Sequence, residues 1–468
     1  MVATPPKLIT GSQYLPDVNG NLEALSPNQS LMPLTARVND RGYLEIGGCD
    51  VTTLVQRFGS PLYILDEVSL RLACRQYRDA LKQFYPGESL VLYASKAWNC
   101  LAICALVHQE GLGVDVVSGG ELQTALQAGV NPRCLYLHGN NKSVSELTMA
   151  INAGCTIVVD NWFELKTLAE LAEAPTPNED PQKVRIMLRL TPGIECHTHD
   201  YIRTGQLDSK FGFDPNELDA VFQFVSQHPS LNCLGLHAHI GSQIFELRPH
   251  EDLAGVMVDW LSKAAQYGLS IQELNVGGGL GIRYTETDDP PRIDEWCRVI
   301  AEGIAKACQE GQIPLPKLLC EPGRSIVGTT CVTAYTMGGQ KVIPGIRTYA
   351  TIDGGMSDNP RPITYQSVYR AVVANRMREP LTEVVTIAGK HCESGDVLIA
   401  DSQQPPTQAG DILAVMGTGA YNYSMASNYN RLPRPAAVLV NHGEAHLILK
   451  RETVQDLLRQ DCLPDHLN

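Results

Sequence analysis

Short apolar runs alternate with longer segments of helical spacing through the middle of the chain. The runs cover residues 90–95, 113–118, 135–139, 156–160, 185–190, 234–240, 273–277 and 317–320. Helix-like segments lie at 66–85, 119–128, 143–153, 163–172, 217–227, 250–267 and 294–309. This alternation predicts an α/β fold, a parallel sheet closed into a (β/α)8 barrel of the TIM type. An open doubly wound sheet usually has fewer strands, and residues 90–323 fit the usual barrel length of about 250 residues, so we favour the barrel.

A different pattern begins after residue 323. Seven short β-rich runs, at 331–337, 347–353, 383–387, 396–400, 411–416, 436–440 and 445–449, are separated by Gly, Pro and Asn. They predict an all-β C-terminal domain, a β-sandwich or small barrel, over 326–468, after a barrel domain at 61–325. We expect 37–60 to be a strand segment that pairs with the C-terminal domain. Residues 1–36 are rich in Pro, Asn, Gly and Ser and predict a poorly ordered tail.

Composition narrows the classes of function. The chain of 468 residues is 44% hydrophobic and 19% charged, an ordinary globular balance. Its net charge of -14 argues against a nucleic-acid partner, because no basic excess exists to displace counterions. We find no apolar stretch long enough to span a membrane and no secretory signal. Its 14 cysteines are scattered without CxxC pairs, which indicates reduced thiols and a cytoplasmic protein.

Polar residues gather at the carboxyl ends of the predicted barrel strands, where barrels of this kind form their active sites. In chain order these residues are Lys96, Asp115, Arg189, His239, Gly277, Gly278, Gly279, Glu321, Gly323 and Arg324. A lone strand-end lysine is most often solvated, and a glycine run is most often a flexible turn. Their occurrence together predicts a polar site at the barrel mouth.

The residue types at this mouth suit one cofactor. A lysine that ends an apolar run can be desolvated and react with an aldehyde. Glycines at a strand end let backbone N–H groups close on a phosphate. A partly buried carboxylate such as Glu321 needs a partner, and a protonated pyridine nitrogen would serve. Together these features predict a site for pyridoxal 5'-phosphate, which would make decarboxylation or racemisation of an amino acid accessible.

Several longer motifs then resemble those of the diaminopimelate decarboxylase family. They are YASKA (93–97), HGNNK (138–142), SKFG (209–212), HAHIGSQ (237–243), GGGLG (277–281), EPGRS (321–325), CESGD (392–396) and GAY (419–421). The resemblance runs from about Gly42 to about Pro435. It implies a barrel-type pyridoxal-phosphate decarboxylase that converts meso-2,6-diaminopimelate to L-lysine and carbon dioxide, the last step of lysine biosynthesis.

The resemblance also implies roles for individual residues. Lys96 would form an imine with the cofactor, His239 would stack on its ring and Glu321 would pair with its nitrogen. The remaining cofactor-binding positions would be Asp115, Arg189, Ser242, Gly277, Gly278, Gly279, Gly323, Arg324 and Tyr421. Cys392 would return a proton to the α-carbon. Cys392 and Glu393 would reach the cofactor of a neighbouring subunit, which implies a homodimer with shared active sites.

Substrate choice depends on the far end of the substrate. Diaminopimelate carries a second carboxylate and a second ammonium there, whereas ornithine and lysine carry only an ammonium. The resemblance gives Arg361 to the distal carboxylate, Glu393 to the distal ammonium, and Arg324, Tyr365 and Tyr421 to further substrate contacts. An arginine can bind a carboxylate through two parallel hydrogen bonds.

Three alternatives stay open at this stage. The first is a decarboxylase of the same fold that acts on carboxynorspermidine, ornithine or arginine. The second is a metal hydrolase built on the pairs His197/His199 and His237/His239, because histidines two apart on a strand can bind zinc. The third is an inactive regulator that has kept the fold, against which Lys96, Glu321 and Cys392 argue together.

Overall fold

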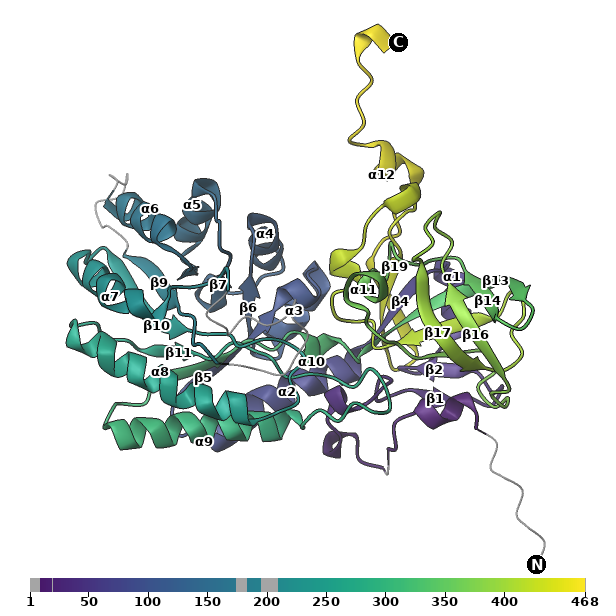
Figure 1. Ribbon diagram of the computed structural model, residues 1–468, viewed down its shortest axis with the longest axis horizontal. Helices are drawn as coiled ribbons and strands as arrows, with labels where there is room; N and C mark the ends of the chain where they lie inside the picture. The colour runs from purple at the N-terminus through teal and green to yellow at the C-terminus, as the bar shows by residue number, and fades with distance from the viewer. Residues whose placement is uncertain (1–8, 19, 174–182, 195–208, 468) are drawn as a thin grey trace, which may run out of the picture. The chain divides into compact units, whose positions relative to one another are not determined.

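The computed structural model describes residues 9–18, 20–173, 183–194 and 209–467. The chain divides into two compact units (Figure 1). One unit contains Arg71–Ile282 and Asp289–Ile326, and the other contains Met1–Leu70, Arg283–Asp288 and Val327–Asn468. We call them the barrel unit and the β unit.

Eight parallel strands form a closed barrel in the barrel unit. They are β5 (Ser89–Ala94), β6 (Gly113–Val116), β7 (Leu135–Leu137), β8 (Thr156–Val159), β9 (Val184–Arg189), β10 (Leu231–His237), β11 (Glu273–Asn275) and β12 (Lys317–Cys320). Each strand pairs in parallel with the next, and β12 closes the ring by pairing with β5. The predicted eight-stranded barrel is therefore confirmed.

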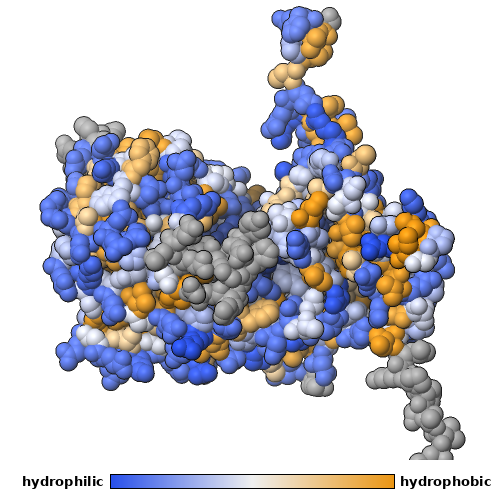
Figure 2. All heavy atoms as spheres, viewed as in Figure 1, coloured by the Kyte–Doolittle hydropathy of each residue, from blue (hydrophilic) through white to orange (hydrophobic). Residues whose placement is uncertain are grey.

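Helices alternate with the barrel strands along the chain, beginning with α2 before β5 (Figure 1). They are α2 (Glu67–Phe84), α3 (Leu101–Gln109), α4 (Gly119–Gln127), α5 (Val144–Ala153), α6 (Trp162–Glu173), α7 (Leu218–Gln227), α8 (Arg248–Gln266), α9 (Ile293–Gly311) and the short α10 (Arg324–Val327). The helix α9 buries Trp296, Ile300 and Ile304 on one side and exposes Lys306 and Glu310 on the other. Figure 2 shows the resulting, mainly hydrophilic outer surface along α8 and α9. Each fully buried large apolar side chain contributes roughly 1.5–3 kcal/mol.

The barrel interior is packed with side chains, so it is a core and not a pore. Leu92, Tyr136, Val158, Met187 and Leu319 form a buried cluster inside it. The Tyr136 hydroxyl donates to Glu273 Oε2 at 2.8 Å and satisfies a carboxylate on β11. This filling leaves the loops at the carboxyl ends of the strands to form a site.

The β unit is built on a second, larger set of strands. They are β4 (Leu62–Asp66), β13 (Cys331–Ile343), β14 (Arg347–Ile352), β15 (Ala371–Val373), β16 (Glu383–Ala388), β17 (Val397–Gln404), β18 (Ile412–Met416), β19 (Ala436–Asn441) and β20 (Glu444–Leu449). The order in the sheet is β17-β16-β14-β13-β4-β19-β20, and β18 joins β13 to β15. The only α-helices after β13 in the described residues are α11 (Arg361–Tyr365) and α12 (Val454–Leu458). The expected all-β C-terminal domain is thus present.

The N-terminal residues belong to the β unit more fully than the sequence pattern suggested. The strand β4 was expected inside the 61–325 barrel domain, but it pairs with β13 and β19. Before it, β1 (Arg37–Val38), β2 (Leu44–Ile46) and β3 (Cys49–Asp50) form a three-stranded sheet of their own, followed by α1 (Val51–Phe58). Backbone bonds such as Leu44 N–H to Ala374 O, at 2.7 Å, join this segment to the rest of the unit.

Part of the expected tail is packed. Tyr14, Leu31 and Met32 are buried in the same apolar cluster as the central strands of the β unit. The Thr329 hydroxyl donates to the carbonyl of Pro27 at 2.8 Å. The expectation of a poorly ordered tail over 1–36 does not hold for these residues, because the polar composition hid the few apolar side chains that anchor them.

None of the helices in the described residues combines the length and apolar character that crossing a membrane requires.

Candidate active site

Glu321 occupies the centre of the barrel mouth, directly after β12. Its side chain is buried and receives three hydrogen bonds. His138 Nε2 lies 2.8 Å and Asn275 Nδ2 2.6 Å from Oε1, and His237 Nε2 lies 3.1 Å from Oε2. The His138 and His237 rings meet edge to face with centroids 4.8 Å apart. Residues from β7, β10, β11 and β12 therefore converge on one carboxylate.

The surroundings keep this carboxylate ionised. Burial alone would raise the pKa of Glu321, but His138 and His237 outweigh it and hold the pKa well below its usual value. Burial lowers the pKa of His237 to about 4, so its ring is neutral near pH 7. Asp115 is the counterpart: burial raises its pKa, and its Oδ1 lies 3.8 Å from His138 Nε2 without a hydrogen bond. The mouth thus contains one firmly anionic carboxylate and one that binds a proton more readily.

His239 and the glycine turn after β11 are bound to each other. The Gly278 N–H donates to His239 Nδ1 at 3.2 Å, and the Gly277 N–H donates to Asn275 Oδ1 at 3.0 Å. Gly277 has a φ of +68°, and a Cβ there would lie 2.7 Å from His239 Nδ1, so a larger residue does not fit. Two of the three N–H groups that were expected to close on a phosphate are therefore already used within the protein.

The charge state of His239 follows from this contact. A backbone N–H can only donate, so Nδ1 must be the unprotonated nitrogen. Burial and the nearby positive charge of Lys96 hold the pKa of His239 well below its usual value. The ring is therefore neutral, with its proton on Nε2.

Ser242 and Arg324 meet at the same mouth. Ser242 Oγ accepts hydrogen bonds from Arg324 Nε at 3.2 Å and Nη2 at 3.1 Å. Gly323 allows the chain before Arg324 to approach β5, since a Cβ there would lie 2.9 Å from the carbonyl oxygen of Ala94. This close approach brings the end of β12 next to the segment that carries Lys96.

Lys96 lies in a single 3₁₀ turn (Ser95–Ala97) immediately after β5. Its positive charge lowers the pKa of His239, and it acts in the same direction on Asp115 and Glu121, whose pKa values burial raises. The side chain is exposed, so the expected desolvation of its amine is wrong for this structure. The end of β5 therefore fixes the position of Lys96, and Asp115, Glu121 and His239 are the titratable groups that interact with its charge.

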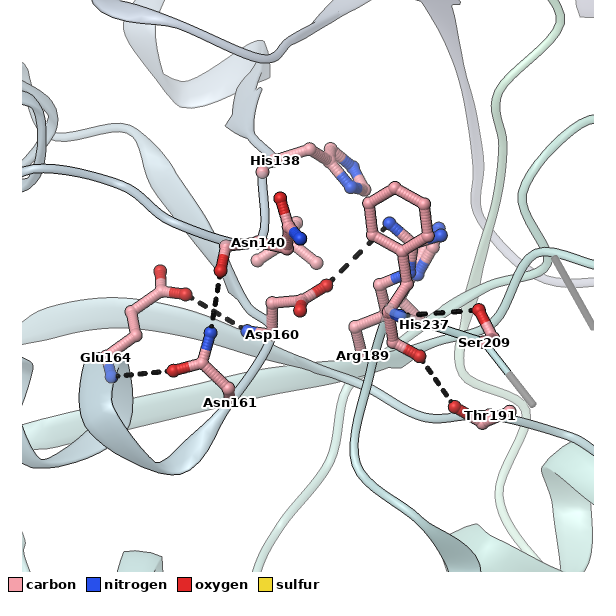
Figure 3. A network of polar contacts seen from close by, with 12 residues as sticks. His138, Asn140, Asp160, Asn161, Glu164, Arg189, Thr191, Ser209 and His237 are labelled. Atoms are coloured by element: carbon pink, nitrogen blue, oxygen red, sulfur yellow. Dashed lines mark hydrogen bonds and ion pairs between the residues drawn. The ribbon is translucent and has the colours of Figure 1, made fainter. Parts of the chain in front are cut away.

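Arg189 is held in a network that supports the mouth from one side (Figure 3). Its Nη1 lies 3.9 Å from Asp160 Oδ1, and its guanidinium lies 4.3 Å from the centre of the Phe211 ring. Burial lowers the pKa of Arg189. The carboxylates of Asp160, Glu321 and Asp115 act against this burial and favour the charged guanidinium.

Arg361 lies in the β unit, at the start of α11, within a group of tyrosines. Its side chain is buried, and Nη1 donates to the hydroxyls of Tyr284 at 2.7 Å and Tyr369 at 3.1 Å. The guanidinium also lies 5.8 Å from the ring centres of both Tyr365 and Tyr421. Three residues expected at the substrate, Arg361, Tyr365 and Tyr421, are thus brought together.

Cys392 and Glu393 lie on an exposed turn of the β unit. The Cys392 N–H donates to Asn430 Oδ1 at 2.8 Å. The neighbouring His391 is buried, and its Nδ1 lies 2.6 Å from Asp396 Oδ2. Asp396 Oδ1 also accepts from the Met356 N–H at 2.7 Å, so one carboxylate joins the Cys392 turn to the segment that leads into Arg361.

One group could hold a metal ion among the described residues: His138, His237 and Glu321, whose ligand atoms all lie within 4.8 Å of one another. Their mutual hydrogen bonds already account for this closeness. The pair His237/His239 does not form such a group, since His239 Nδ1 is bound to the glycine turn. His197 and His199 lie outside the described residues.

The residues fit pyridoxal phosphate in three respects. An anionic buried carboxylate suits a protonated ring nitrogen, a neutral imidazole suits the face of a ring, and Ser242 with Arg324 offers a hydroxyl and a cation to a phosphate. Residues 70–328 match the family model described as the pyridoxal binding domain of pyridoxal-dependent decarboxylases. The barrel and its mouth thus place the chain in the class of pyridoxal-dependent decarboxylases.

Full-length relatives narrow this class. The chain is 64% identical over 450 residues to the diaminopimelate decarboxylase of Synechocystis, covering 94% of this chain and 95% of the relative. It is 45% identical to that of Bacillus subtilis, covering 91% and 97%. The solved diaminopimelate decarboxylase of M. jannaschii in complex with L-lysine has a TM-score of 0.84 at 32% identity, covering 95% of this chain and all of that one. The chain belongs to the diaminopimelate decarboxylase family.

Sequence reasoning missed several residues that complete these arrangements. Asn275 bridges Glu321 and Gly277, and Tyr284 and Tyr369 hold Arg361. Asp396 stands in the CESGD motif but was given no role. Tyr284 follows the GGGLG motif by three residues, and that proximity was the available signal.

Proposed function

We propose that this protein decarboxylates meso-2,6-diaminopimelate to L-lysine and carbon dioxide with pyridoxal 5'-phosphate as cofactor. The observation that carries the proposal is the setting of Arg361. A buried guanidinium needs hydrogen-bond partners, and its Nε has none among the described residues. Within the described part of the chain no carboxylate lies within 4 Å of it. A substrate with a carboxylate at its far end would complete this site, whereas ornithine or lysine would not.

In the barrel unit, Lys96 provides the amine for the cofactor aldehyde. Glu321 holds the proton of the ring nitrogen, His239 covers one face of the ring, and Ser242 and Arg324 bind the phosphate beside the Gly277–Gly279 turn. Asp115, Arg189 and Gly323 shape the surrounding mouth. When bound, pyridoxal phosphate supplies an electron sink for the electrons released at the α-carbon as carbon dioxide leaves.

In the β unit, Arg361 binds the distal carboxylate, with Tyr365 and Tyr421 beside it. Glu393 accepts hydrogen bonds from the distal ammonium. The Cys392 thiol delivers a proton to the α-carbon, and the exposure of its turn leaves it open to a second subunit. We therefore also propose a cytoplasmic homodimer in which Cys392 and Glu393 of one subunit complete the site of the other.

A lysine-release assay on a substrate panel tests the proposal. We expect turnover of meso-diaminopimelate and little or none of ornithine, arginine or carboxynorspermidine. Lys96→Ala should abolish turnover and the near-visible absorption of the bound cofactor. Arg361→Ala should lower kcat/KM for diaminopimelate by a hundredfold or more, because an unpaired buried charge typically costs about 3–5 kcal/mol. A preference for ornithine, or full activity in Arg361→Ala, would overturn the substrate assignment.

A further inference from the structure

The guanidinium of Arg361 is fixed through one of its nitrogens. Nη1 has two hydrogens, and the Tyr284 and Tyr369 hydroxyls accept from it at 2.7 and 3.1 Å. The two tyrosine rings meet edge to face, with centroids 5.4 Å apart and planes at 79°. Both hydrogens of Nη1 are therefore used by neutral partners within the β unit.

Each tyrosine is itself held in place. Tyr369 is fully buried, and its hydroxyl donates to Asn422 Oδ1 at 3.4 Å. Tyr284 lies in the short segment 283–288 of the β unit, where its backbone N–H donates to Asp288 Oδ2 at 3.0 Å. The same segment carries Glu286, which pairs with Arg370 at 2.9 Å, directly after Tyr369 in the chain. Both hydroxyls thus stand at fixed positions relative to Arg361.

The other edge of the guanidinium makes no hydrogen bond within the described residues. In the part of the chain that the structure describes, the buried Nε has no hydrogen-bond partner, and Nε and Nη2 form the planar fork that matches a carboxylate. We infer that Tyr284 and Tyr369 are positioning residues for substrate specificity: they hold Arg361 by Nη1 and turn its Nε–Nη2 edge to the distal carboxylate. This inference rests on the proposed function and adds two residues to it.

A pair of ligands isolates the distal carboxylate. Loss of carbon dioxide from diaminopimelate leaves L-lysine, whose single carboxylate is the distal one. Cadaverine, 1,5-diaminopentane, is L-lysine without that carboxylate. Inhibition of the wild-type holoenzyme by the two compounds therefore measures how much affinity the carboxylate contributes.

We expect Tyr284→Phe and Tyr369→Phe each to weaken inhibition by L-lysine by about tenfold, the factor that about 1.4 kcal/mol represents, and to leave cadaverine within twofold of wild type. The KM for diaminopimelate should rise with kcat nearly unchanged, because binding at the far end is equal in the ground and transition states. In an Arg361→Lys background, which lacks the fork, neither tyrosine change should affect the ratio of L-lysine to cadaverine inhibition.

Tyr85→Phe is the matched control. Tyr85 is a buried tyrosine whose hydroxyl donates to Pro316 O at 2.6 Å, just before β12 at the opposite end of the strand from the mouth. It should leave both inhibition constants unchanged. Equal weakening of L-lysine and cadaverine by Tyr284→Phe, or no weakening of either, would overturn the inference. A wild-type enzyme that does not decarboxylate diaminopimelate, or that binds both ligands equally, would instead overturn the proposed function.

Discussion

Lys142 and Glu164 form a buried ion pair beneath the loop that carries His138. Both side chains are 2% exposed, and Nζ lies 2.7 Å from Glu164 Oε1. Nζ also donates to the carbonyl oxygens of Gly139 at 2.7 Å and Val158 at 2.8 Å. Lys142→Met keeps most of the side-chain volume but leaves the Glu164 carboxylate buried without its cation. We expect a loss of about 3–5 kcal/mol in unfolding free energy.

The loss of unfolding free energy in Lys142→Met should depend on pH, and the pKa of Glu164 determines whether it grows or shrinks as the pH falls. Burial raises the pKa of Glu164, while Lys142 lowers it, so removal of Lys142 raises that pKa further. A folded-state pKa above the unfolded value means that the folded variant binds the proton more tightly than the unfolded chain. The deficit relative to wild type should therefore be largest at pH 8 and shrink as the pH falls toward 5.

Thermal unfolding of the two proteins at pH 8, 6.5 and 5 measures this effect. A deficit of this size corresponds to roughly 3–5 °C in Tm at pH 8, at about 1 °C per kcal/mol for a chain of 468 residues. Lys142→Met/Glu164→Gln should recover much of the loss, because the neutral amide can stay buried at lower cost. Lys306→Met, which breaks an exposed 4.0 Å pair with Glu310, should barely change Tm. A pH-independent deficit, or no recovery in the double variant, would refute the reasoning.

Three further changes test the site and its supports. Glu321→Gln should weaken retention of pyridoxal phosphate in equilibrium dialysis by tenfold or more, since an amide cannot hold the ring proton through charge; unchanged retention would contradict the proposed pairing of Glu321 with the ring nitrogen. Burial lowers the pKa of His250 to about 3, so the protein loses unfolding free energy as the pH falls below about 6.5, where this histidine gains a proton only in the unfolded chain. His250→Leu should remove about 2 kcal/mol of the loss in unfolding free energy that urea titrations measure between pH 6.5 and 5. Asp396→Asn should weaken the contacts that tie the Cys392 turn to His391 and Met356. We therefore expect a lower kcat, a smaller change in KM and faster alkylation of the Cys392 thiol. An unchanged alkylation rate would contradict this role of Asp396.

The barrel and much of its mouth were predictable because parallel strands converge. Lys96, His239, Glu321 and Arg324 follow strand ends in the sequence, and the closed sheet necessarily brings those ends to one face. The exposure of Lys96 was not predictable in the same way, because an apolar strand says nothing about which direction the next turn takes.

Contacts between distant, individually ordinary residues could not be read from the sequence. Tyr284 is 77 residues from Arg361, and neither Tyr284 nor Tyr369 belongs to an apolar period or a motif with a known requirement. Residues 62–66 fell inside the barrel domain predicted over 61–325, and only the pairing of β4 with β13 and β19 assigns them to the β unit. Local patterns specify elements, whereas long-range packing selects their partners.

The buried ion pair Lys142–Glu164 and the buried charges of Glu321 and Arg361 differ in how they are partnered. Lys142 and Glu164 cancel each other, so nothing remains for a ligand. Glu321 is hydrogen-bonded to Asn275, His237 and His138, and the two histidines hold its pKa well below the usual value, so the carboxylate stays anionic. Arg361 is bound by tyrosine hydroxyls. Neutral partners satisfy the hydrogen-bonding groups of an ion but leave its charge largely uncompensated. Desolvation without a counter-ion is costly, and a ligand of opposite charge would offset that cost. Glu321 therefore suits a cationic ring nitrogen and Arg361 a carboxylate, which are the two charges that a pyridoxal-dependent decarboxylase acting on diaminopimelate must recognise.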